Sequence, residues 1–157
     1  IGAEIIYFGD DLGHQNSLPI RPSDWRRYLK IPFSKMFSIC RENNVYVYLH
    51  TDGNIIEIIP DLIECGVNIL NPQIRANTLE GIEKNCKGKV AINLDLDRQL
   101  FPFATEEEIE NHIKKAVDKL ALPEGGLMLI AECGPDIPLK NIDKICNTFE
   151  ELGCRGL

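Results

Sequence analysis

The stretch VYVYLHTDG, residues 45–53, joins a β-strand to the polar groups that follow it. Valine and tyrosine favour extended backbone, and the apolar run Val45–Leu49 ends in His50 and Asp52. Because side chains alternate along a strand, His50 and Asp52 would lie on the same side if the strand continues through them. The segment therefore predicts a strand whose end carries two metal-binding or proton-transferring groups.

Four other apolar runs end in the same way, each followed by polar side chains. They are Ile5–Phe8 before Asp10 and Asp11, Val67–Leu70 before Asn71 and Gln73, Val90–Leu94 before Asp95 and Asp97, and Leu127–Ala131 before Glu132 and Cys133. Strands that all finish in polar groups are typical of a site at the carboxyl edge of a parallel sheet.

Helical patterns alternate with these strands. They run from Pro22 to about Glu42, over Ile56–Cys65, over Thr78–Cys86, from Thr105 to about Leu120, and from Pro138 to just before Gly153. Pro32 is expected to kink or break the first helix, and Thr105 with Glu108 predicts a capping box at the start of the fourth. The order predicts a single α/β domain over residues 1–157 with parallel strands. Periodicity does not choose between an open sheet and part of a closed barrel.

Composition excludes several classes of protein. The net charge of −7 over 157 residues argues against nucleic acid and against an anionic membrane surface. No apolar stretch approaches the ~20 residues that span a bilayer, and the glycine-rich phosphate loops of nucleotide-binding proteins are absent. Six cysteines without framework spacing indicate free thiols of a cytoplasmic protein. The chain begins inside a predicted strand, which indicates a piece of a longer protein.

The order of five motifs resembles the uroporphyrinogen decarboxylase-like family over nearly the whole chain. The motifs are GDDLGHQNS at 9–17, LHTDG at 49–53, IPDLIECGVNILNPQ at 59–73, LFPFATEEEI at 100–109 and ECGPDIPLKNI at 132–142. The resemblance implies the carboxyl-terminal part of a (β/α)8 TIM barrel that lacks roughly its first three strands. Such a fragment would have open strand edges, and we expect these to pair with another copy or with the rest of the protein.

Within that family, the resemblance is greatest to the methyltransferase branch. Methyltransferases of this branch hold zinc through a His-x-Cys pair on one strand and a distant cysteine. His50 matches the histidine, Cys133 matches the distant cysteine, and Asp52 stands where the family has the other cysteine. The resemblance thus implies zinc and methyl transfer between a corrinoid (methylcobalamin) partner protein and a small thiol or similar acceptor.

Two other functions stay open. One is a metal-free lyase of the uroporphyrinogen decarboxylase type acting on a tetrapyrrole, and the other is a non-catalytic ligand-binding paralogue. Asp52 is equally consistent with a metal ligand, because zinc accepts carboxylate oxygen, and with a cap on the turn at Gly53.

The remaining strand-end groups are assigned to catalysis or to substrate. Asp95 and Asp97 share one strand face, where neighbouring carboxylates raise the pKa of one of them, although Arg98 could neutralise the pair. Only one of the adjacent Asp10 and Asp11 can face a site. We assign Asp10 and Asp95 to catalysis and Asp11, Gln15, Asn71 and Gln73 to substrate binding. His112, on a charged helix, is expected to have no role.

Overall fold

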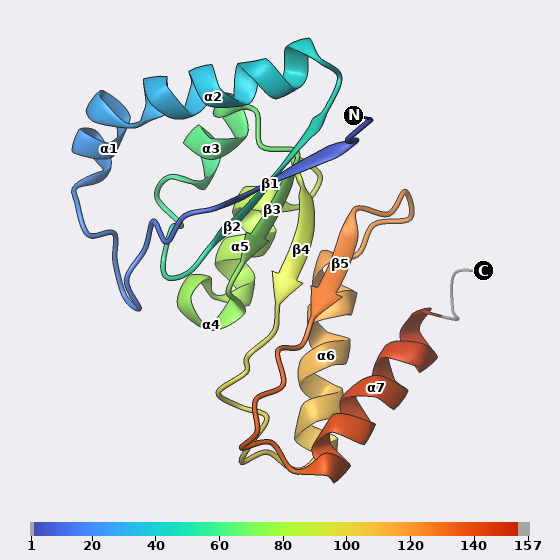
Figure 1. Ribbon diagram of the computed structural model, residues 1–157. Helices are drawn as coiled ribbons and strands as arrows, with labels where there is room; N and C mark the ends of the chain where they lie inside the picture. Colours follow the sequence, from blue (N-terminus) through green and yellow to red (C-terminus); the bar gives the residue numbers. More distant parts are fainter. Residues whose placement is uncertain (1, 154–157) are drawn as a thin grey trace.

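The computed structural model describes residues 2–153 and places five parallel strands in one sheet (Figure 1). The strands lie side by side in the order in which they occur in the chain, and every neighbouring pair is parallel. They are β1 (Ile5–Gly9), β2 (Tyr46–Thr51), β3 (Ile69–Pro72), β4 (Ala91–Asp95) and β5 (Leu127–Ile130).

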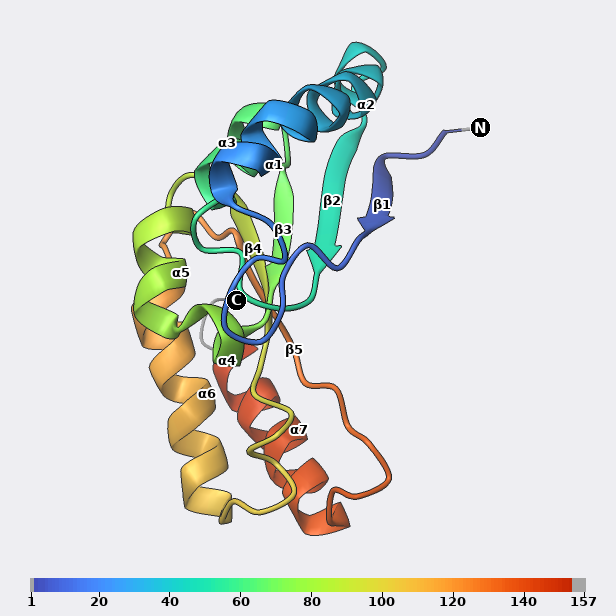
Figure 2. The ribbon, with the colours of Figure 1, turned by 90° about the vertical axis from the view of Figure 1, so that its left-hand side faces the viewer.

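The helices cover one face of this sheet, and the other face is left open (Figure 2). They are α1 (Pro22–Tyr28), α2 (Lys30–Glu42), α3 (Ile59–Cys65), α4 (Ile74–Asn77), α5 (Leu79–Cys86), α6 (Glu106–Leu120) and α7 (Leu139–Gly153). A doubly wound sheet has helices on both faces and a reversal of strand order. Parallel strands in sequential order, with all helices on one side of the sheet, are typical of a segment of a (β/α)8 barrel. The chain is therefore a partial TIM-barrel-like fold.

Alternation along the strands separates a core face from a polar face. Val47, Leu49 and Leu70 are fully or almost fully buried beneath the helices, as are Ile92 and Leu94. The intervening residues point to the concave face, where His50 is the register partner of Gly9 and Asn71, and Asp95 is the partner of Ile130. The predicted polar groups therefore lie on the inner side of the barrel wall.

The helices differ from the prediction at three places. The first helical pattern breaks at Leu29 rather than at Pro32, which lies in the first turn of α2 where proline costs no hydrogen bond. The short helix α4 was not predicted, because four residues are too few to show a helical period. α3 begins at Ile59, three residues later than expected. The capping box of Thr105 and Glu108 is confirmed.

The strand at one end of the sheet is exposed on both faces. In β1, Ile6 on one face is 40% and Tyr7 on the other is 63% accessible to solvent. The pairing of this open edge with another chain or segment stays a prediction. Five cysteines are free among residues 2–153, and Cys154 lies outside that range. None of the helices described here combines the length and the apolar character needed to cross a bilayer.

Candidate metal centre and adjoining cavity

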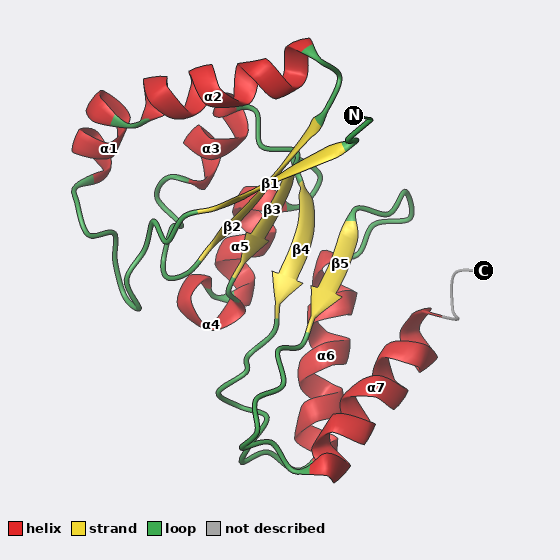
Figure 3. Ribbon diagram, viewed as in Figure 1, coloured by secondary structure: helices red, strands yellow, loops and turns green. Residues whose placement is uncertain are grey.

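Two loops at the carboxyl ends of β1 and β2 touch through their backbones. Gly13 N donates to Asp52 O at 3.2 Å, and Leu12 N donates to Thr51 Oγ1 at 2.9 Å. Gly53 has a φ of +79°, and a Cβ there would lie 2.1 Å from Gly13 O. A side chain at Gly53 would therefore separate the loops. The loops leave the strands at one edge of the sheet (Figure 3). Their close approach there brings Asp11 beside Asp52.

Three potential metal ligands converge there. One ligand atom from each of Asp11, His50 and Asp52 lies within 4.8 Å of the other two. His50 Nε2 is 3.4 Å from Asp52 Oδ1, and Asp52 N donates to Asp11 Oδ1 at 3.4 Å. The structure does not bring Cys133 into this group, and Asp11, which we assigned to substrate, stands in its place. Within residues 2–153 no second cluster of this kind occurs.

The hydrogen bonds of Asn71 indicate which ring nitrogen of His50 carries a hydrogen atom. Asn71 Nδ2 donates to the carbonyl oxygen of Asn93, which can only accept, so the amide orientation is determined. Asn71 Oδ1 then lies 2.7 Å from His50 Nδ1, which must be the donor. In a neutral ring, Nε2 carries the lone pair and points it at a carboxylate. Two acceptors at 3.4 Å repel, so a proton or a metal cation belongs between them.

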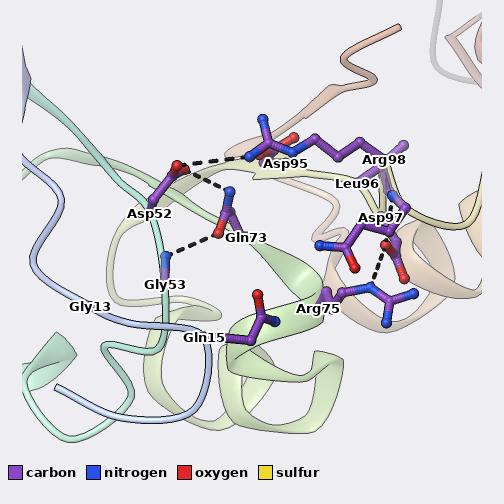
Figure 4. A pocket seen from close by; sticks show the side chains of 11 residues that line it. Gly13, Gln15, Asp52, Gly53, Gln73, Arg75, Asp95, Leu96, Asp97 and Arg98 are labelled. Atoms are coloured by element: carbon purple, nitrogen blue, oxygen red, sulfur yellow. Dashed lines mark hydrogen bonds and ion pairs between the residues drawn. The ribbon is translucent and has the colours of Figure 1, made fainter. Parts of the chain in front are cut away.

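Asp52 is held by the neighbouring strand as well. Gln73 Nε2 donates to Asp52 Oδ1 at 2.6 Å, and Gly53 N donates to Gln73 Oε1 at 3.0 Å (Figure 4). Arg98 reaches across from the loop after β4, 3.8 Å from Asp52 Oδ2, and also pairs with Glu132. Gln73 therefore orients a candidate ligand, and because it also lines the adjoining cavity its contact with substrate stays a prediction.

A cavity of about 170 Å³ adjoins the cluster. Its polar lining includes Gln15, Asp52, Gln73, Arg75, Asp95 and Arg98. Asp95 is only 6% exposed, and its Oδ1 has no hydrogen-bond partner. Burial raises the pKa of this carboxyl, although Arg98 acts in the opposite direction. A carboxyl group of this kind holds a proton more readily than an ordinary aspartate.

The other predicted residues lie in different surroundings. Asp10 is exposed and does not line the cavity, and its backbone N donates to His50 O at 3.2 Å. Cys133 is exposed, with Sγ 3.6 Å from the carbonyl oxygen of Ala131 in its own loop. Burial and the neighbouring Cys146 raise the pKa of the Cys133 thiol. Neither side chain reaches the cluster in this structure.

His112 is not on the solvent-exposed side of α6, and its expected lack of a part in the chemistry stays a prediction. The ring is half-buried on α6 and accepts a hydrogen bond from Asp97 N at 3.3 Å. Phe101 packs against it with the ring centroids 6.2 Å apart. His112 thus supports the loop that carries Asp97 and Arg98. The sequence indicated the burial of His112 only through its position three residues after the apolar Ile109, on the same side of α6.

Sequence reasoning also missed Asn77, which connects the loops after β2 and β3. It is 1% exposed and donates to Gly53 O and Gln73 O, and its Oδ1 accepts from Ile55 N at 2.8 Å. Arg75 was missed as well, and it pairs with Asp97 at 2.7 Å. Both lie in or next to α4, so the missed helix is the reason for the missed residues.

Comparisons with known proteins agree with this fold. A family model described as uroporphyrinogen decarboxylase (URO-D) matches residues 1–152. A methyltransferase from Methanosarcina mazei is similar with a TM-score of 0.63 and 25% identity, over 96% of this chain and 43% of that chain. A dihydropteroate synthetase with bound product is similar in fold alone, with a TM-score of 0.53 and 15% identity over 96% of this chain and 58% of that one. A search of curated proteins gives no match. The chain thus spans about half the length of these solved structures, and it belongs to the uroporphyrinogen decarboxylase family.

Proposed function

We propose that the protein is a zinc-dependent methyltransferase, in which Asp11, His50 and Asp52 hold the metal. It would move a methyl group between a corrinoid on a partner protein and a small thiol or similar acceptor. One observation carries this proposal: His50 Nε2 lies 3.4 Å from Asp52 Oδ1 while Nδ1 is occupied by Asn71, and Asp11 offers a third ligand atom within 4.8 Å of the other two. Similarity to the Methanosarcina mazei methyltransferase supports the type of reaction.

The three groups fit zinc in kind and in spacing. Zinc takes imidazole nitrogen and carboxylate oxygen at about 2.1 Å, so the edge of its tetrahedron is about 3.4 Å. The separation between His50 Nε2 and Asp52 Oδ1 is 3.4 Å. A hydrogen bond from the other ring nitrogen to an amide oxygen is the usual arrangement behind a metal-bound histidine. Three protein ligands would leave a fourth position for the acceptor.

Bound zinc would supply a Lewis acid that lowers the pKa of the acceptor's thiol. The residues of the chain do the rest. Asn71 fixes the tautomer of His50, and Gln73 orients the Asp52 carboxylate. Arg98 offsets part of the negative charge that the two carboxylates bring together. Asp95, beside the cavity and with a raised pKa, is placed to hold or donate a proton to a bound ligand.

All of our site assignments stay predictions, and two of them need more than the structure provides. Cys133 would join the metal only if its loop moved toward β2. Catalysis by Asp10 requires a ligand that extends beyond the cavity, because its side chain is exposed at the rim.

The cavity is less suited to a decarboxylase acting on a tetrapyrrole with many carboxylates. Its acids are Asp52, Asp95 and Asp97, and its two cations are Arg75 and Arg98. Each arginine is already paired with an acid of the chain, Asp97 and Glu132 respectively. With three acids against two cations, the lining carries a net negative charge that disfavours a substrate with many carboxylates.

Zinc content and methyl transfer test the proposal together. We expect the purified protein to bind one zinc per chain and to demethylate methylcobalamin, followed by absorbance, when a thiol acceptor is supplied. His50→Ala should abolish both. His14→Ala is the matched control, since His14 is an exposed histidine of the neighbouring loop. Zinc retained at full stoichiometry in His50→Ala would overturn the assignment, and a zinc-bound protein inert toward methylcobalamin would overturn the reaction.

A further inference from the structure

A second cavity of about 560 Å³ lies beside the first at the same edge of the sheet. The loops after β4 and β5 form most of it, and α4 contributes Arg75. The lining also includes Arg98, Gln99, Phe103, Glu132 and Ile137. Arg75, Arg98 and Gln99 line both cavities. The two spaces are therefore compartments of one groove, and Arg98 stands at their junction. The size of the second compartment suits a small organic ligand.

Phe103 presents an aromatic ring to this compartment. It is 89% exposed, the most exposed large apolar side chain of residues 2–153. Its loop is firmly held: Phe103 N and Ala104 N both donate to Leu100 O, at 3.1 and 3.0 Å. Asn141 Nδ2 from α7 donates to Phe101 O and Ala104 O, on either side of the ring. The exposure of the ring is thus built into an ordered loop.

Arg75 adds a planar cation to the same compartment. Among the described residues, its guanidinium has one partner, Asp97, which it contacts through Nε. Its two terminal nitrogens are left to bind an oxyanion, for which the guanidinium fork is shaped. Neither of the two nearby acids is bonded to Arg75. Glu132 is paired with Arg98, and Asp136 Oδ1 lies against Gly134, 2.6 Å from where a Cβ of that residue would be.

We infer that this compartment binds a planar aromatic acid, with its ring on Phe103 and its carboxylate on Arg75. Aromatic rings pack on one another in offset or edge-on geometry, and Ile137 supplies a buried apolar wall. A substituent on such a ligand could extend past Arg98 into the first cavity, toward the proposed metal centre. The inference rests on the proposed function only in treating this groove as a substrate site.

Binding of benzoate to the metal-free protein, measured by titration calorimetry in the presence of a chelator, tests this directly. We expect binding in the millimolar range, and at least tenfold weaker binding of cyclohexanecarboxylate, which has the charge without the flat ring. Phe103→Ala and Phe103→Leu should each weaken benzoate at least tenfold. Arg75→Gln should weaken benzoate but leave the weak binding of neutral benzamide unchanged.

Leu139→Ala is the matched control, because Leu139 is 80% exposed and lines neither cavity. Benzoate that does not bind, that binds no better than cyclohexanecarboxylate, or that binds equally to Phe103→Leu would overturn the inference. Zinc is absent from this experiment, so failure of the proposed metal centre would leave its result unchanged.

Discussion

Replacing Asn71 by leucine tests how the cluster is organised. Asn71 is 4% exposed, and leucine fills a similar volume without forming hydrogen bonds. The change removes the contact with His50 Nδ1 and the bond to Asn93 O. Loss of an outer-shell partner of a metal-bound histidine costs about 10- to 100-fold in metal affinity, or about 1.4–2.7 kcal/mol. Two lost hydrogen bonds and one buried unpaired carbonyl should cost about 2–4 kcal/mol of folding stability.

Zinc affinity is measured by competition with a chromophoric chelator, and stability by urea unfolding of the metal-free protein. Asn141→Leu is the control. Asn141 is 1% exposed and also donates to backbone carbonyls, at Phe101 and Ala104, but it is remote from the cluster. We expect both variants to lose stability and only Asn71→Leu to lose zinc affinity. A folded Asn71→Leu protein that binds zinc within twofold of the wild type would refute the tautomer argument.

Three further changes report on the fold around the site. Gly53→Ala should cost about 3 kcal/mol in urea unfolding, because a Cβ would overlap Gly13 O and φ is positive; a loss below about 1 kcal/mol would contradict the close loop contact. Thr105→Ala should lower the free energy of unfolding by about 1 kcal/mol, because the helix cap is lost. An unchanged midpoint of urea unfolding would contradict a stabilising role for this cap. Burial lowers the pKa of His112, so the unfolded chain takes up a proton first as the pH falls, and wild-type stability should drop from pH 6.5 downward. That acid-side loss should be smaller in His112→Gln, and an identical pH profile of the midpoint would show that the ring does not matter.

Much of the fold could be predicted because each strand carries its own local signal. The apolar runs before Asp10, His50, Asn71 and Asp95 became β1 to β4, and their polar ends meet at one edge as parallel strands require. Whether the sheet is open or part of a barrel could not be predicted from periodicity. That property depends on strand order and on which face the helices cover, and neither leaves a trace in a local pattern.

The membership of the cluster was harder to predict than its location. His50 and Asp52 lie two residues apart on one strand, so their proximity follows from alternation. The third member depends on which loop packs against the loop after β2. The contact between Gly13 and Gly53 places the loop after β1 there. This contact brings Asp11 to the cluster, whereas Cys133 follows β5, at the other end of the sheet from β1.

Zinc K-edge X-ray absorption of the zinc-loaded protein, without added thiol, tests the central claim most directly. The arrangement of Asp11, His50 and Asp52 predicts a first shell of nitrogen and oxygen only, at about 2.0–2.2 Å, with imidazole scattering from one histidine. A sulfur neighbour at about 2.3 Å would contradict it and point to Cys133. A spectrum without imidazole would remove His50 from the metal altogether.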